Sequence, residues 1–133
     1  MSVYESKLEG THNQYEKLNQ AIRTGRFVRN SIIRAWMDNR IKSRNDAYKY
    51  CKILACCPEF PWAKQLNSMA RQAHAERAWA SIERFYRFCK AKTSAKKGYP
   101  KFRKHQVKDS VEYKTSGWKL SEDRRYLNFT LWF

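Results

Sequence analysis

The chain has 133 residues, a length that predicts one domain with a modest core. Hydrophobic residues make up 42% of it and aromatic residues 15%, which excludes a disordered basic tail. The formal net charge of +16 predicts an anionic partner. Nucleic acid is favoured over a membrane surface, because the helix stripes are only moderately apolar and the basic run lies in a loop rather than on one helix face. No apolar run approaches the roughly 20 residues that span a bilayer.

The beginning of the chain, residues 1–10, alternates apolar and polar positions and predicts a short strand. It lacks the charged-then-apolar layout of a signal peptide. Four cysteines are present, two of them adjacent, and none forms a CxxC pair. We therefore expect no metal and no cofactor, and reduced thiols in a cytoplasmic protein.

Residues 11–92 predict a helical region of about three helices. In residues 13–39 the apolar positions recur at steps of three and four, with a gap at Gly25 that predicts a kink or close packing. Thr11 is a candidate N-cap. We interpret the neighbouring basic face as a nucleic-acid contact, although a solvated face is the plainer alternative: Arg23, Arg26, Asn30 and Arg34.

A second, shorter helix is predicted over residues 47–56, with Asn45 or Asp46 as its cap. Pro58 and Pro61 end it, because proline cannot continue a helix. Pro61 is also well placed to begin the next element, since proline suits the first helical position.

The third helix is predicted from Trp62 or Asn67 to about Lys92. Its many alanines favour helix formation and permit a close approach of a neighbouring helix. His74 lies in the middle of it. We interpret this histidine as a structural or surface residue rather than a metal ligand.

A basic loop, residues 93–109, follows the helices. From position 84 to position 108 the chain has ten Lys or Arg residues and no Asp or Glu. The plainest partner for such a segment is a phosphate backbone. Tyr99 and Phe102 lie among these cations and have two interpretations: they stack on bases, or they anchor the loop to the core.

Residues 110–133 change to a period of two and predict an antiparallel β-meander with turns at Ser116-Gly117 and at residues 121–125. The chain ends on the apolar residues 131–133, from which we expect an incomplete β unit. The predicted fold class is therefore α+β, with three helices packed beside a small antiparallel β unit.

Four segments together resemble the TnpB (OrfB) family of transposon-encoded proteins: residues 26–30 (RFVRN), 67–73 (NSMARQA), 97–102 (KGYPKF) and 110–120 (SVEYKTSGWKL). Their order and approximate spacing match across most of the chain. The KGYPKF block followed by the strand block is the more specific part. Members of the family are RNA-guided DNA endonucleases, traditionally described as transposases.

This resemblance implies a layout for the chain. Residues 1–10 and 110–133 would belong to a wedge-type β-barrel, and residues 11–92 would be a helix-turn-helix-like recognition insert. The implied partners are guide-type RNA and double-stranded DNA, with no small-molecule substrate. The nuclease portion of such proteins is the implied protein partner.

The resemblance also assigns roles by position. Base readout is assigned to six residues: Ser68, Met69, Gln72, Thr115, Ser116 and Tyr50. Gln72 is preferred among them, because a glutamine amide can pair with an adenine edge. The alternative for Gln72 is a plain solvent-facing residue of the helix. Phosphate contacts are assigned to a basic set: Arg71, Arg77, Arg84, Lys96, Lys97, Lys101, Arg103 and Lys104.

The family's nuclease carries three acidic metal ligands and a four-cysteine zinc ribbon. After Tyr113 the only acidic residues are Glu122 and Asp123, both in a predicted turn. Two-metal cleavage needs clustered carboxylates, so we predict that this chain has no nuclease activity of its own. The alternative is a self-standing DNA- or RNA-binding regulator derived from a transposase, which a well-covered strand at residues 126–133 would favour.

Overall fold

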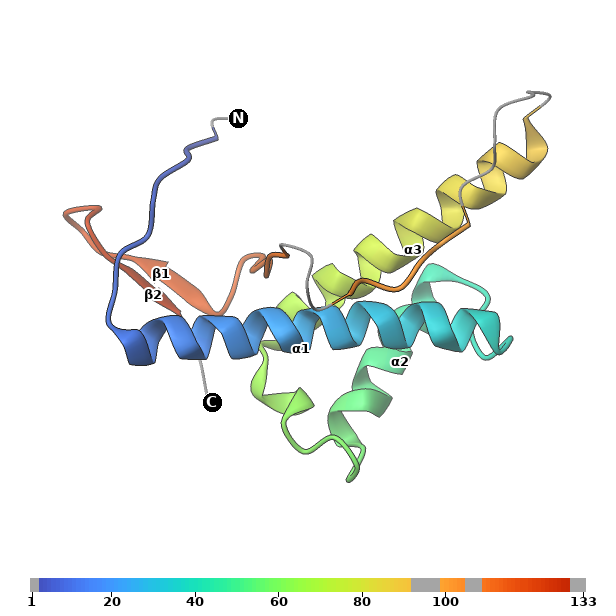
Figure 1. The fold of residues 1–133 in the computed structure, drawn as a ribbon, viewed down its shortest axis with the longest axis horizontal. Helices are drawn as coiled ribbons and strands as arrows, with labels where there is room; N and C mark the ends of the chain where they lie inside the picture. Colours follow the sequence, from blue (N-terminus) through green and yellow to red (C-terminus); the bar gives the residue numbers. More distant parts are fainter. Residues whose placement is uncertain (1–2, 92–98, 105–108, 130–133) are drawn as a thin grey trace.

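The computed structural model describes residues 3–91, 99–104 and 109–129. The described residues form three α-helices, one short 3-10 helix and two strands (Figure 1): α1 (His12–Met37), α2 (Arg44–Cys56), η1 (Ala63–Gln65), α3 (Ser68–Lys90), β1 (Trp118–Leu120) and β2 (Leu127–Phe129). This is a small, mostly helical α+β arrangement with one antiparallel pair of strands. The predicted fold class is confirmed at that level.

Helix α1 begins at the predicted cap and continues through Gly25 without interruption. The backbone N of Gln14 donates to Thr11 Oγ1 (3.3 Å), and the backbone N of Thr11 donates to Gln14 Oε1 (2.8 Å), which completes a capping box. A Cβ added at Gly25 would lie 2.5 Å from His74 Nε2. Close packing rather than a kink therefore explains this glycine.

The second and third helices begin where a polar side chain caps their first turn. Ser43 caps α2 instead of the predicted Asn45 or Asp46, so the helix begins earlier than expected, at Arg44. Asn67 caps α3, because its Oδ1 accepts hydrogen bonds from the backbone N of Met69 (3.0 Å) and of Ala70 (3.1 Å). Of the two predicted beginnings of the third helix, the one at Asn67 is therefore right.

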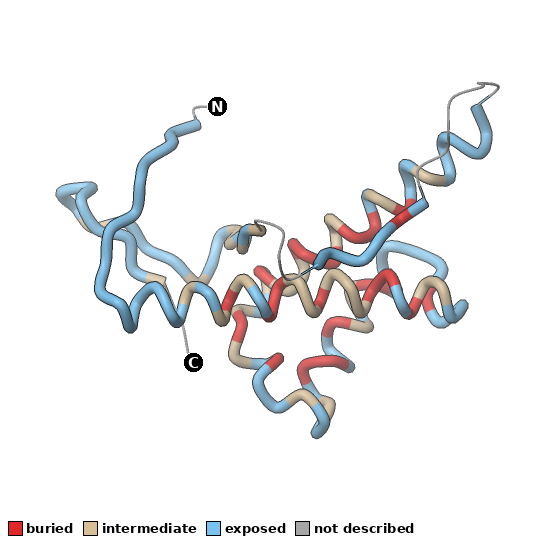
Figure 2. Tube along the Cα trace, in the orientation of Figure 1, coloured by how far each residue is buried: buried red, intermediate tan, exposed pale blue. Residues whose placement is uncertain are grey.

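The core lies where the three helices meet, as the buried segments in Figure 2 show. Ile32 and Ile33 of α1 pack with Trp79 and Ile82 of α3. Alanines of α3 are fully buried at this contact, which allows the close approach expected from the sequence. The apolar stripe ends near Ile82, and the last two turns of α3 are largely exposed (Figure 2).

Two predicted strands are not formed. Residues 3–10 are exposed and adopt neither helix nor strand, so their alternating pattern buries nothing. Residues 110–117 also form no strand. Val111 and Tyr113 instead pack against a second apolar cluster made by Ala21, Leu66 and Ala70. An extended segment buries alternate side chains against helices as well as in a sheet, which is why the period of two was misleading.

The remaining strands form a hairpin beside the first half of α1 (Figure 1). β1 and β2 are antiparallel, with Trp118 opposite Phe129. The predicted turn between them is present, and the backbone N of Ser121 donates to the carbonyl O of Tyr126 at 2.9 Å. Gly117, in the other predicted turn, has φ +88°, a conformation that favours glycine.

Candidate nucleic-acid interface

Residues 99–104, here called the basic segment, are fixed to the helices by two side chains of α1. Asn30 Nδ2 donates to the carbonyl O of Arg103 (3.0 Å), and the backbone N of Arg103 donates to Asn30 Oδ1 (2.8 Å). Arg29 Nη1 donates to the carbonyl O of Lys101 (3.0 Å) and Nη2 to Ser81 Oγ (3.4 Å). The backbone of the basic segment is thus held against α1, within reach of α3.

Aromatic contacts hold the start of the basic segment. The ring of Tyr99 packs against Trp36 and Phe85, with centroid distances of 5.5 and 5.0 Å. Pro100 is buried beside it. Of the two interpretations for Tyr99, the structure supports the anchor. Phe102 remains 44% exposed.

The charged side chains of the basic segment are exposed. Lys101, Arg103 and Lys104 all face solvent, and Arg84 of α3 is exposed near them. Burial, and next the charge of Arg103, lower the pKa of Arg29 from its usual value. Cations this closely gathered repel one another, and an anion bound among them relieves that repulsion. The predicted Lys96 and Lys97 lie outside the described residues.

A hollow of about 580 Å³ lies between α3 and the basic segment. Residues 99–104 line it together with Arg29, Ser81, Arg84 and Phe88. On α3 these lining positions follow steps of three and four, so they share one face of the helix. The hollow thus combines cations with exposed aromatic rings.

Two arginines of the predicted phosphate set have partners within the chain. Arg71 Nη1 donates to the carbonyl oxygens of Ala63 (3.3 Å), Lys64 (3.1 Å) and Leu66 (2.6 Å), and burial lowers its pKa. It satisfies the carbonyls around η1, so we reassign it to a structural role. Arg77 donates to Ser110 Oγ (3.1 Å) and forms an ion pair with Glu112 (3.6 Å).

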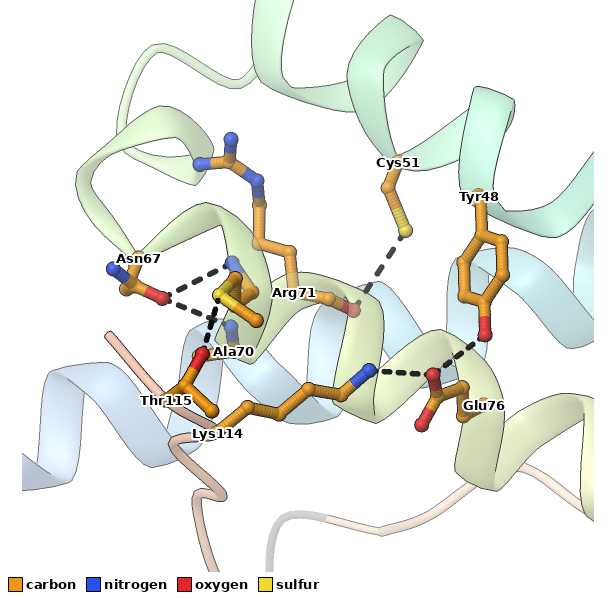
Figure 3. A network of polar contacts seen from close by, with 9 residues as sticks. Tyr48, Cys51, Asn67, Ala70, Arg71, Glu76, Lys114 and Thr115 are labelled. Carbon is orange, nitrogen blue, oxygen red and sulfur yellow. Dashed lines mark hydrogen bonds and ion pairs between the residues drawn. The ribbon is translucent and has the colours of Figure 1, made fainter. Parts of the chain in front are cut away.

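The predicted base-readout residues gather in part at the N-terminal end of α3, where Thr115 lies close to the first turn of the helix (Figure 3). Thr115 Oγ1 lies 3.4 Å from Met69 Sδ, and Asn67 Nδ2 donates to Ser116 Oγ (3.3 Å). The first turn of α3 is thereby joined to the 115–116 turn. Ser68 and Gln72 lie at the same end of the helix, where Ser68 is exposed and Gln72 is half-buried. Tyr50 is different, because it packs against the core of the three helices.

A carboxylate of α3 holds the chain just before that turn. Lys114 Nζ and Tyr48 OH both donate to Glu76 Oε1, as Figure 3 shows. Although partial burial opposes ionisation, these two hydrogen bonds lower the pKa of Glu76. The turn is therefore tied to α3 at two places, through Glu76 and through Asn67.

His74 has the structural role expected for it. The ring is 1% exposed, and its Nε2 accepts from the backbone N of Glu112 at 3.4 Å. Burial, followed by the charge of Arg77, lowers the pKa of His74 to about 4. The imidazole is therefore neutral at physiological pH and acts as an acceptor.

Burial raises the pKa of the Cys51 thiol to about 11, so it is a poor nucleophile at neutral pH. Among the described residues, no three His, Cys, Asp or Glu side chains gather closely enough to hold a metal ion. None of the described helices combines the length and the hydropathy needed to cross a bilayer.

Sequence reasoning missed how the basic face of α1 is used. Arg23 pairs with Glu16 and Arg34 with Asp38, each at 3.2 Å. Asn30, expected to contact nucleic acid, instead holds the basic segment. Arg29 and Asn30, the last two residues of the RFVRN block, both bond to the basic segment. The block was noticed in the sequence, but the sequence alone does not show that these residues contact positions more than 70 residues away.

Comparison of the chain with protein-family models and with curated proteins finds no match in either. The resemblance to the TnpB family stays a hypothesis that depends on the four quoted blocks.

Proposed function

We propose that this chain binds nucleic acid, as the N-terminal binding region of a TnpB/OrfB-like protein does. In this proposal it holds guide-type RNA and contacts double-stranded DNA beside the target. The observation that carries the proposal is the basic segment, whose backbone is bonded to Arg29 and Asn30 while its cations remain exposed. Because the backbone of this segment is already positioned, only its side chains lose entropy when they contact a phosphate backbone.

The arrangement of the four resembling blocks supports the family part of the proposal. Residues 26–30 bond to residues 101 and 103, so the RFVRN block contacts the basic segment, which shares four residues with the KGYPKF block. Residues 67 and 69 bond to the turn at 115–116, so the other two blocks also meet. Blocks chosen by sequence alone therefore pair in space, as parts of one recognition unit do.

In this proposal the hairpin belongs to a wedge-type β unit, and residues 11–92 are the recognition insert. Of the strand predicted at 126–133 the structure describes residues 126–129, where Tyr126 is 66% and Leu127 42% exposed. That exposure favours this proposal over a self-standing regulator. We further propose that the chain binds without cleaving, since the acidic residues after Tyr113 are confined to Glu122 and Asp123.

The test is direct binding of a structured RNA and of duplex DNA, each titrated over a series of salt concentrations. We expect tight RNA binding that persists at moderate salt, and weaker DNA binding. Equal affinities that collapse steeply with salt would reduce the interface to a nonspecific electrostatic patch and contradict guide holding. Absence of binding to either at low salt would contradict the proposal as a whole.

A further inference from the structure

The hollow between α3 and the basic segment has features that phosphate binding does not require. Phe88 is 41% exposed and Phe102 is 44% exposed, and both line it. Exposed rings gain nothing from an ionic partner, and their burial by a flat apolar face is favourable. Ser81 supplies a hydroxyl, and Arg84 a planar guanidinium.

We propose that this hollow binds an unpaired nucleobase of a single-stranded nucleic acid while the basic segment holds the adjoining phosphates. The inference rests on the proposed function and adds the class of ligand. Aromatic rings and arginine planes are the surfaces on which unpaired bases stack. A base inside a duplex has both faces covered by its neighbours, so it has no face to offer Phe88 or Phe102.

The size and charge of the hollow fit this ligand. Its volume, about 580 Å³, lies in the range of roughly 300–1,000 Å³ found for small-molecule sites. The cations Lys101, Arg103 and Lys104 line it and are exposed, so they complement the phosphates on either side of a bound base. An apolar ligand without negative charge would leave those cations unused.

The test distinguishes recognition of the bases from recognition of the phosphates. Two oligomers of about 12 nucleotides are compared, oligothymidylate and an abasic oligomer with the same phosphates. We expect wild type to bind oligothymidylate roughly 5- to 150-fold more tightly than the abasic oligomer, the range found for stacking on aromatic side chains. Oligouridylate should show the same preference over an abasic oligomer if the base rather than the sugar is recognised.

Matched variants test whether the preference for bases depends on the rings of Phe88 and Phe102. Phe88→Ala with Phe102→Ala should reduce the preference for bases to the part that Arg84 and the 50% exposed Tyr99 still supply, and leave affinity for the abasic oligomer unchanged. Phe88→Tyr with Phe102→Tyr should keep the preference, because the rings remain. Tyr126→Ala, which removes an exposed ring from the hairpin, should also keep it. If the double alanine variant does not fold, Phe102→Ala alone gives the test, since its ring lies outside the core clusters.

Equal affinity of wild type for oligothymidylate and the abasic oligomer would overturn this inference and leave the proposed function intact. A preference that both alanine substitutions leave undiminished would also overturn it. Failure of wild type to bind any of these oligomers, the structured RNA or the duplex would overturn the proposed function as well.

Discussion

Asn30 of α1 and Arg103 of the basic segment share two hydrogen bonds across a sequence separation of 73 residues. The amide of Asn30 acts as both donor and acceptor for one backbone unit, as a neighbouring strand would. Arg103 therefore has its backbone fixed and its guanidinium exposed. This contact turns a basic stretch of sequence into a positioned row of cations.

Asn30→Ala should weaken nucleic-acid binding without changing the net charge. Each neutral hydrogen bond contributes about 1 kcal/mol, so the basic segment loses about 2 kcal/mol of attachment. We expect RNA affinity to fall by up to about thirtyfold, measured by fluorescence anisotropy. Asn19→Ala, at an exposed position on the same helix, is the control. Equal affinities of the two variants would show that the attachment has no role in binding.

Alanine substitutions of Arg71 and Arg84 should have different effects, the first on the stability of the fold and the second on nucleic-acid binding. Arg71→Ala leaves three carbonyl oxygens around η1 without their donor and should lower the free energy of unfolding by about 2 kcal/mol. Arg84→Ala should leave stability within about 0.5 kcal/mol and lower the salt slope of nucleic-acid binding by about one. Urea denaturation and salt titration of both variants check this. If Arg71→Ala instead lowered the salt slope and left stability unchanged, Arg71 would be a phosphate contact as the sequence predicted.

Gly25→Ala should destabilise the fold even though alanine favours helices by about 1 kcal/mol. The added Cβ would lie 2.5, 2.7 and 2.8 Å from three atoms of the buried His74 ring. We expect a net loss of about 1–3 kcal/mol in urea denaturation. Asn19→Ala, at an exposed position of the same helix, is the control, because it introduces alanine by replacing an exposed side chain with a smaller one. A stabilised Gly25→Ala variant would contradict the tight packing of α1 on α3.

His74 should make stability depend on pH. Its pKa is about 4 in the folded protein and 6.5 when unfolded, so between these values the unfolded chain binds more protons. The free energy of unfolding should fall by up to about 3 kcal/mol as pH drops through that window. His74→Gln should flatten this dependence, whereas His12→Gln, at an exposed position, should not. Parallel pH profiles for wild type and His74→Gln would refute the role of this histidine.

The sequence predicted the helices well, because an apolar stripe and a cap are local properties. Thr11 was predicted as a cap from its residue type and is one, whereas α2 is capped by Ser43 and not by the predicted Asn45 or Asp46. The strand expected at residues 110–115 was wrong, since alternation reports which side chains are buried and not what covers them. Val111 and Tyr113 are buried against helices, so their period is the same as in a sheet.

The site was predictable in composition but not in geometry. The basic run indicated a phosphate partner, yet Arg71 looks no different from Arg84 in sequence. What separates them is that Arg71 lies within reach of the carbonyls of residues 63–66, a consequence of how η1 packs before α3. The contact of Asn30 with Arg103 likewise depends on packing between distant segments, which cannot be predicted from a single sequence.

The most direct measurement compares two variants that lose the same charge. One changes Lys101, Arg103 and Lys104 to Gln, and the other changes three exposed lysines on α2 and η1: Lys49, Lys52 and Lys64. Each is titrated with the same duplex DNA and structured RNA over a range of salt concentrations. We expect the first variant to lower the duplex salt slope by roughly 2–3, and the second by less than about one. Equal losses in the two variants would show that net charge, and not the fixed basic segment, binds nucleic acid.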